Sequence, residues 1–263
     1  MDIATIETGI HALILETGAF IRGEREKFSV QKVESKAGRN NLVSYVDRGA
    51  EDRLTKGCRK LLPAAGFIRE EGGDENPDAP YRWIIDPLDG TTNFIHDIPS
   101  YCISLALQFE EATIFGVVYD VPRDDYYQAR LGGGATLNGV PIHTSKASSM
   151  SESLFSTGFP YAQSDILPDY LAVIAEVVQA SRGMRRFGAA ALDLAWVACG
   201  KVEGFFEIGL QAWDVAAGEL LVREAGGTVT DFSGTDNYIF GRQIVAGGSA
   251  VHADFLRLVS VLA

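Results

Sequence analysis

Two aspartates that could bind a metal ion lie close together in the first half of the chain. Asp86 and Asp89 directly follow the apolar run Trp83–Ile85. A short apolar run predicts a buried strand, and Pro87, which has no backbone N–H, is expected to prevent that strand from continuing. Both carboxylates would then lie at one strand end, where their hard oxygens suit a divalent cation such as Mg²⁺.

The residues that follow favour an anion site beside the aspartates. Gly90 permits a tight turn, and Thr91 and Thr92 suit the start of a helix. The first N–H groups of a helix have no partner within it and attract anions. One turn would therefore present oxygen ligands and a phosphate cradle side by side, as metal-assisted phosphoryl chemistry requires.

Further acids are needed, because two carboxylates alone rarely hold Mg²⁺ against water. Glu70 and Glu71 follow the apolar residues 66–68, Glu207 ends another apolar run, and Asp214 opens a predicted helix. Taken singly, Asp214 also fits a helix cap, and Glu70-Glu71 fits a solvated loop. The joint occurrence of these acids favours a metal site, since acids after apolar strands are costly without charge compensation.

The composition limits the classes of function. The 263 residues include 23 Lys and Arg against 35 Asp and Glu, so the formal net charge is 23 − 35 = −12. This acidic balance argues against nonspecific nucleic-acid binding and against an anionic membrane surface. Three widely spaced cysteines, with no signal-peptide pattern and no long apolar run, lead us to expect a cytoplasmic globular protein.

Periodicity predicts the elements that must position the acids in the first half. Apolar residues recur at helical spacing over about 3–28 and 47–64. Strands are predicted at 102–109 and 113–119, within an antiparallel meander whose turns carry Gly, Asn and Asp.

The second half alternates between strands and helices, which favours an α/β layer. The predicted strands are 154–157, 204–208, 228–230 and 244–246, and the predicted helices are 165–181, 189–199, 213–225 and 250–262. A lobe boundary is expected near 140–150. Residues 1–145 would form an N-terminal α+β lobe and residues 146–263 a C-terminal α/β lobe of one compact unit.

The motifs resemble those of a known family. Residues 86–94 read Asp-Pro-Leu-Asp-Gly-Thr-Thr-Asn-Phe, and residues 213–218 read Trp-Asp-Val-Ala-Ala-Gly. With residues 67–71, 186–193 and 204–207, they resemble the inositol monophosphatase family of Mg²⁺-dependent, lithium-sensitive phosphatases. The resemblance covers nearly the whole chain. It implies a layered αβαβα sandwich of the sugar-phosphatase type, two or three Mg²⁺ ions per site, inhibition by Li⁺, and a homodimer.

The resemblance also implies roles for single residues. The expected Mg²⁺ ligands are Glu70, Asp86, Asp89, Asp214 and the backbone carbonyl of Leu88. The expected catalytic group is Thr91, which would position the attacking water with the support of Asp47 and Glu70.

A further set of residues is expected to contact the substrate. The phosphate would meet the backbone N–H groups of Gly90 and Thr91, with Lys36 near the phosphate and the more weakly bound metal. The polyol hydroxyls would meet Asp89, Ala190 and Glu207.

Some residues depart from the family's common pattern. Arg69 stands where glycine is common before the paired glutamates, and Gly72 stands where serine is common. The polar segment 72–80 contains two prolines and is expected to be a mobile, lid-like loop. None of these departures removes an expected metal ligand, so they bear on loop geometry and substrate preference.

Together the motifs predict an enzyme that hydrolyses a small polyol or sugar phosphate with Mg²⁺. We expect inositol 1-phosphate as substrate, and direct transfer to water without a phosphoenzyme. The same site also fits fructose 1,6-bisphosphate, histidinol phosphate, 3′-phosphoadenosine 5′-phosphate and NADP.

An alternative of another class is a regulatory protein-binding factor with secondary phosphatase activity. The resemblance supports it, because some bacterial relatives associate with transcription or ribosome-assembly machinery. Within the sequence, the basic cluster Arg182, Arg185 and Arg186 is the one hint of a partner surface. A solvated face or a subunit contact is the simpler interpretation of that cluster.

Overall fold

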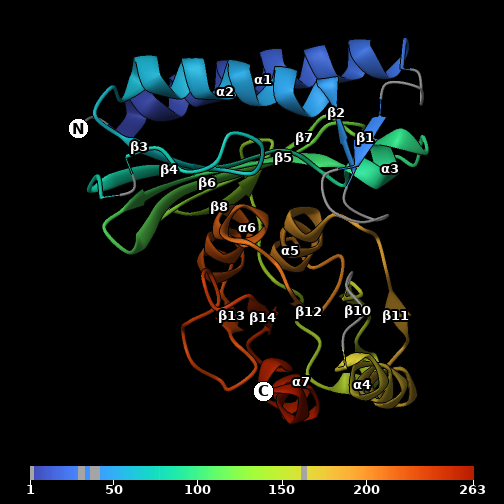
Figure 1. The fold of residues 1–263 in the computed structure, drawn as a ribbon. Coiled ribbons are helices and arrows are strands. Elements are labelled where there is room, and N and C mark those ends of the chain that lie inside the picture. Colours follow the sequence, from blue (N-terminus) through green and yellow to red (C-terminus); the bar gives the residue numbers. More distant parts are fainter. Residues whose placement is uncertain (1–2, 29–32, 36–41, 77, 161–164) are drawn as a thin grey trace.

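Five layers stack in the order helices, sheet, helices, sheet, helices (Figure 1). The predicted αβαβα sandwich is therefore confirmed. The computed structural model describes residues 3–28, 33–35, 42–76, 78–160 and 165–263. Among these residues, no helix combines the length and the apolar character needed to cross a membrane.

The larger sheet has seven strands. In spatial order they are β3 (Gly66–Arg69), β4 (Tyr81–Asp89), β5 (Cys102–Phe109), β6 (Ala112–Asp120), β7 (Asp125–Arg130), β8 (Gly134–Leu137) and β9 (Val140–Pro141). β3 and β4 are parallel, and every later pair is antiparallel, as the meander predicted. Asn138 and Gly139 both have positive φ and form the tight turn between β8 and β9.

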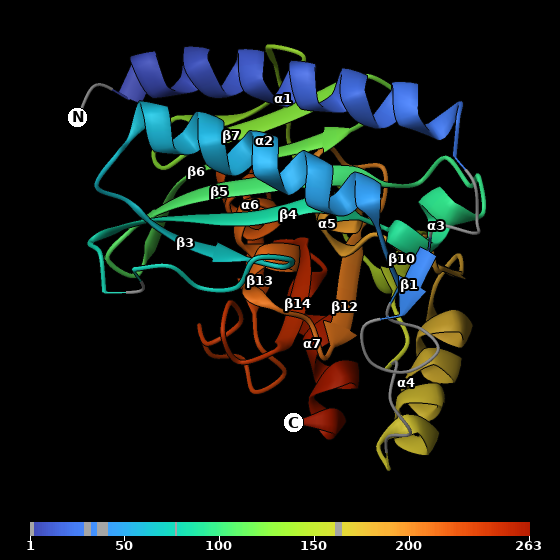
Figure 2. The same cartoon turned by 45° about the horizontal axis from the view of Figure 1, so that its top comes forward.

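Two helices, α1 (Ile3–Arg25) and α2 (Tyr45–Leu61), cover one face of this sheet (Figure 2). Buried side chains at helical spacing join them to the sheet in one hydrophobic core. Both helices match the predicted ranges to within three residues. α2 ends at Leu61 because Pro63 disfavours helical backbone at the residue before it.

The smaller sheet has five strands. In spatial order they are β11 (Met184–Arg185), β10 (Phe155–Thr157), β12 (Gly204–Ile208), β14 (Gln243–Gly248) and β13 (Gly227–Thr230). The outer helices α4 (Leu167–Ala180) and α7 (His252–Val259) pack on it through a third hydrophobic cluster. The predicted alternation is confirmed, whereas the two-residue strand β11 is too short for a sequence pattern to reveal.

The remaining described elements are short. They are the antiparallel pair β1 (Val33–Ser35) and β2 (Leu42–Ser44), the helix α3 (Thr91–Ile95), and the 3₁₀ turns η2 (Met150–Glu152) and η3 (Ser260–Leu262). The start of a helix at Thr91 is as predicted.

The middle layer consists of α5 (Ala190–Ala198) and α6 (Ala212–Glu224), which lie between the two sheets (Figure 1). Every residue of α5 is buried, as expected for a helix enclosed on all sides. Gly116 of β6 allows α6 to approach closely, because a Cβ there would lie 3.0 Å from the backbone of Ala217. This packing fixes the start of α6 relative to the strands of the larger sheet.

The prediction that Pro87 prevents the strand from continuing is wrong. β4 runs on to Asp89, and its register against β5 shifts between Asp86, which pairs with Ser104, and Asp89, which pairs with Cys102. Proline is tolerated in a strand at such an irregularity, where no ladder hydrogen bond is needed from its nitrogen. Asp86 and Asp89 therefore flank the irregularity at the end of β4.

Candidate metal centre and active site

Three carboxylates from two elements meet where β4 ends and α6 begins. Asp86 and Asp89 come from β4 and Asp214 from the first turn of α6, and one oxygen of each lies within 4.8 Å of the others. Asp86 is buried, and the other two are half-buried. The resemblance implied that Asp214 joins the pair although it is more than 120 residues away along the chain, and the structure brings the three aspartates together.

The pKa values of these carboxyls are all raised, so their charged forms are unfavourable without a nearby positive charge. Burial raises the pKa of Asp86 well above its usual range, and Glu70, Asp89 and Asp214 raise it further. Burial likewise raises the pKa of Asp214, and it raises that of Asp89 to about 6. Because clustered oxygen donors of like charge are what a hard divalent cation neutralises, the donor set fits Mg²⁺.

Backbone N–H groups orient the three carboxylates. Leu88 donates to Asp86 Oδ1 at 2.9 Å, and Ala191 donates to Asp89 Oδ2 at 2.7 Å. Gln211 donates to Asp214 Oδ2 at 2.6 Å within a capping box, so Asp214 is the third residue of its helix and not the N-cap. Each of these bonds occupies one carboxylate oxygen.

Glu70 lies beside the cluster at the end of β3. Its backbone N–H donates to the carbonyl of Ile85 in β4 at 3.3 Å, and its charge raises the pKa of both Asp86 and Asp214. The structure therefore brings Glu70 together with the three aspartates.

The side chain of Thr91 lies between the strand end and α2. Its Oγ1 is 3.0 Å from Oδ1 of the buried Asp47 and 3.1 Å from the carbonyl of Leu88. Gly90 before it has φ of +90°, and a Cβ there would lie 2.8 Å from the carbonyl of Ser100. Glycine is therefore required at this turn, as the motif predicted.

Glu207 and Ala190 lie near Asp89. Glu207, in β12, is buried, and burial raises the pKa of its carboxyl, with Asp193 and Asp214 adding to the effect. Ala190 begins α5, next to the N–H of Ala191 that binds Asp89. Lys36, expected near the phosphate, lies outside the described residues.

The structure adds residues that the sequence did not single out for the site. Gly158 leaves room for the Glu207 carboxyl, because a Cβ on Gly158 would lie 2.0 Å from it. Asp193 is buried, and its pKa is raised by burial and by Asp89. In the sequence, only the motif Arg186–Asp193 pointed to this region.

Arg186, from the basic cluster, acts on the candidate site through its charge. Its positive charge lowers the pKa of Asp89, Asp193 and Glu207 and so offsets part of the increase that burial causes. Its guanidinium lies against Gly188. Arg186 is exposed, as the interpretation of the cluster as a solvated face predicts, and its charge nevertheless acts on the carboxyls of the candidate site.

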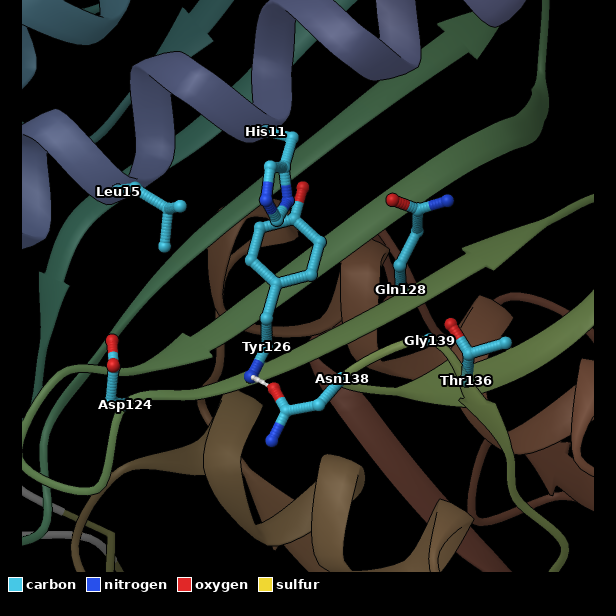
Figure 3. A pocket seen from close by; sticks show the side chains of 8 residues that line it. All are labelled: His11, Leu15, Asp124, Tyr126, Gln128, Thr136, Asn138 and Gly139. Carbon is cyan, nitrogen blue, oxygen red and sulfur yellow. Dashed lines mark hydrogen bonds between the residues drawn. The ribbon is translucent and has the colours of Figure 1, made fainter.

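A separate hollow lies between α1 and the strands β7 and β8 (Figure 3). It is lined by His11, Leu15, Asp124, Tyr126, Gln128, Thr136, Asn138 and Gly139. It shares no residue with the carboxylate cluster and is not the candidate active site.

Five alternating layers, with carboxylates gathered at a strand end and a helix start, define a protein of the sugar-phosphatase type. More specifically, the chain belongs to the inositol monophosphatase family, whose sequence profile matches residues 2–261. The resemblance seen in the motifs is thereby confirmed.

Individual relatives agree with this assignment. The chain is 44% identical over 218 residues to Nus factor SuhB of Escherichia coli (strain K12), covering 82% of each protein. The structure is similar to that of the extragenic suppressor protein suhB from Bartonella henselae, with TM-score 0.91 and 35% identity over 97% of this chain and 98% of the other. The inositol monophosphatase from Anabaena (Nostoc) sp. PCC 7120 gives a TM-score of 0.89 and 34% identity, over 100% and 98%.

Proposed function

We propose that this protein is a regulatory protein-binding factor that retains a Mg²⁺-dependent phosphatase site. The carboxylate cluster supports the phosphatase chemistry, and the relative named Nus factor SuhB supports the regulatory role. The relatives therefore favour this alternative over an enzyme devoted to inositol 1-phosphate.

The carboxylates Asp86, Asp89 and Asp214, with Glu70 and the carbonyl of Leu88, would hold the ions. Bound Mg²⁺ would polarise the phosphoryl group, lower the pKa of a water molecule and stabilise the leaving alkoxide. The neighbouring backbone donors keep the carboxylates oriented before any ion binds, which lowers the cost of assembling the site.

Thr91 would orient the attacking water. Its hydroxyl can donate to Asp47 at 3.0 Å, which turns the oxygen lone pairs toward a water that approaches from the open side. The N–H groups of Gly90 and Thr91 would bind the phosphate oxygens. The reaction then needs positioning and charge stabilisation, and no protein nucleophile.

Glu207 and Arg186 bear on the choice of substrate. A buried acid at Glu207, with Ala190 and Asp89, would accept hydrogen bonds from hydroxyls and repel a second phosphate, which favours inositol 1-phosphate. Arg186 weakens that repulsion because its charge reaches Glu207. Bisphosphates, histidinol phosphate and nucleotide phosphates therefore stay in the test panel.

Phosphate release from that panel, with Mg²⁺ and then with EDTA, tests the chemistry. We expect release that depends on Mg²⁺, and the rank of kcat/KM identifies the preferred substrate. Absence of release from every member, at Mg²⁺ concentrations that stabilise the protein against heat, would contradict the phosphatase assignment.

Charge reversal at the exposed Arg182 and Arg185 tests the regulatory role. Arg186 is left unchanged because its charge reaches the candidate site. We expect Arg182→Glu with Arg185→Glu to reduce co-purification of the transcription machinery from the source cells while phosphate release is unchanged. Failure of the unaltered protein to bind any component of that machinery in purified form would contradict this role.

The proposal also includes a cytoplasmic homodimer inhibited by Li⁺, as the resemblance implies. Sedimentation equilibrium, cell fractionation and a Li⁺ titration of phosphate release test these three features separately.

A further inference from the structure

Arg69 folds back over the turn that follows Glu70. Its Nε donates to the carbonyl of Gly73 at 3.1 Å, and its Nη2 lies 3.4 Å from the carbonyl of Gly72 and 3.4 Å from Oε2 of Glu75. The side chain is only 14% exposed. One guanidinium therefore contacts three residues of the turn.

The same turn is closed on β3 from its far end. The backbones of Phe67 and Glu75 exchange hydrogen bonds of 2.7 and 2.9 Å. Arg59 of α2 binds both carboxylate oxygens of Glu75, at 2.6 and 3.0 Å. Of the segment 72–80, which is expected to be a mobile loop, residues 72–75 are thus tied to β3 and α2.

A buried acid on α2 holds the middle of the turn. Oε2 of Glu51 accepts the N–H of Glu71 at 2.8 Å, and the N–H of Gly72 also bonds to this carboxylate. A Cβ on Gly72 would lie 2.7 Å from Oε1 of Glu51 and 3.0 Å from the guanidinium carbon of Arg69. The departure to glycine at position 72 therefore fits the departure to arginine at position 69.

We infer that Arg69 is a positioning residue that holds the Glu70 carboxylate ready for Mg²⁺ by locking the turn 70–75. The inference rests on the proposed metal role of Glu70. The turn contains Gly72 and Gly73, whose backbone freedom makes ordering costly. A planar guanidinium can bind two carbonyls and a carboxylate at once, which an ammonium cannot do with the same geometry. Arg69 thus orders the turn before the ion arrives.

The experiment compares Arg69→Ala with Arg59→Ala, which removes the outer contact to Glu75 and leaves the bonds of Arg69 intact. Hydrogen exchange of the metal-free protein reports order in the peptide that spans residues 70–76. The Mg²⁺ dependence of thermal unfolding reports ion binding without turnover. The Mg²⁺ half-saturation and kcat of phosphate release separate ion binding from chemistry.

We expect Arg69→Ala to speed hydrogen exchange in this peptide. We also expect the Mg²⁺ midpoint, which is the Mg²⁺ concentration at half-saturation, to rise about 10-fold, the range for loss of a residue that supports a metal ligand. At saturating Mg²⁺, kcat should stay within roughly twofold, because the ligands themselves are intact. Arg69→Lys should fall between Arg69→Ala and the unaltered protein, and Arg59→Ala should move the midpoint less than Arg69→Ala.

An unchanged Mg²⁺ midpoint in Arg69→Ala would overturn the inference, even if thermal stability falls, because the role of Arg69 would then be structural alone. A midpoint shift in Arg59→Ala equal to that in Arg69→Ala would also overturn it. If the unaltered protein binds Mg²⁺ but releases no phosphate, a weaker midpoint in Arg69→Ala would uphold the inference while the proposed activity fails.

Discussion

At the scale of the residue, the candidate site consists of acids whose like charges lie close together. Asp86, Asp89 and Asp214 accept backbone N–H groups at 2.6 to 2.9 Å, yet burial still raises the pKa of each, and repulsion from neighbouring acids raises that of Asp86 and Asp214 further. Such a group of charges is unfavourable alone and becomes favourable with a divalent cation. The carboxylates that the proposed function needs therefore destabilise the folded protein until an ion binds.

Asp89→Asn tests the central carboxylate. It removes one charge from the proposed ligands while keeping the shape of the side chain. We expect phosphate release to fall by at least about 100-fold, since lost charge stabilisation costs a factor of ten for each ~1.4 kcal/mol. Circular dichroism and thermal unfolding without Mg²⁺ should show a folded variant no less stable than the unaltered protein, because repulsion is reduced. Full activity in this variant would contradict the metal assignment.

Gly158→Ala tests the space reserved for Glu207. The added Cβ would lie 2.0 Å from the carboxyl and must displace it. We expect KM for inositol 1-phosphate to rise about 10-fold with a smaller change in kcat, the pattern for lost substrate binding. p-Nitrophenyl phosphate, which lacks the ring hydroxyls, serves as the control substrate and should be affected less. Equal losses on both substrates would contradict a hydroxyl-binding role for Glu207.

At the scale of the element, the site depends on how closely the middle helices pack on the larger sheet. α6 carries Asp214, and α5 supplies the N–H of Ala191 that binds Asp89. Gly116 lies where α6 meets β6, and Gly218 of α6 would place a Cβ 2.5 Å from Leu194 of α5. The glycines set these separations, so they influence the site without touching it.

Gly116→Val tests this dependence. The added side chain would press on the backbone of Ala217, and overpacking of this kind costs about 1–3 kcal/mol. We expect lower stability in urea and a higher Mg²⁺ requirement, because α6 carries Asp214. Ala112→Val, at the exposed start of β6, is the control and should change neither quantity. A loss of stability with an unaltered Mg²⁺ requirement would show that the position of α6 does not govern ion binding.

At the scale of the whole molecule, the formal net charge of −12 and the carboxylate cluster make the protein sensitive to both protons and cations. The folded-state pKa of each cluster carboxyl is raised above its unfolded value. The contribution of such a group is fully present below the unfolded pKa and is lost as pH rises through the folded pKa, about 6 for Asp89. Mg²⁺ competes with those protons for the same oxygens.

Removal of Mg²⁺ should therefore lower the melting temperature more at higher pH. We expect the rise in melting temperature on adding Mg²⁺ to be larger at pH 7.5 than at pH 5.5, because fewer carboxyls are protonated at pH 7.5. Differential scanning calorimetry with Mg²⁺ and with EDTA at both pH values measures this, and Asp89→Asn should reduce the difference. An Mg²⁺ effect that is larger at pH 5.5 would contradict the raised pKa values.

The sequence by itself determined what depends on neighbours along the chain. The apolar periodicity predicted the helices and most strands, and residues 86–92 predicted an acidic turn followed by a helix, because those features rest on local backbone preferences. The resemblance of the motifs also implied that the distant Asp214 joins that turn. Only the tertiary structure decided that the charge of Arg186 acts on Asp89 and Glu207, and that Gly158 leaves room for the Glu207 carboxyl. The tertiary structure also continues β4 past Pro87 to Asp89, because the register against β5 shifts there and Pro87 needs no ladder hydrogen bond. Such contacts follow from the stacking of five layers, which no short stretch of sequence encodes.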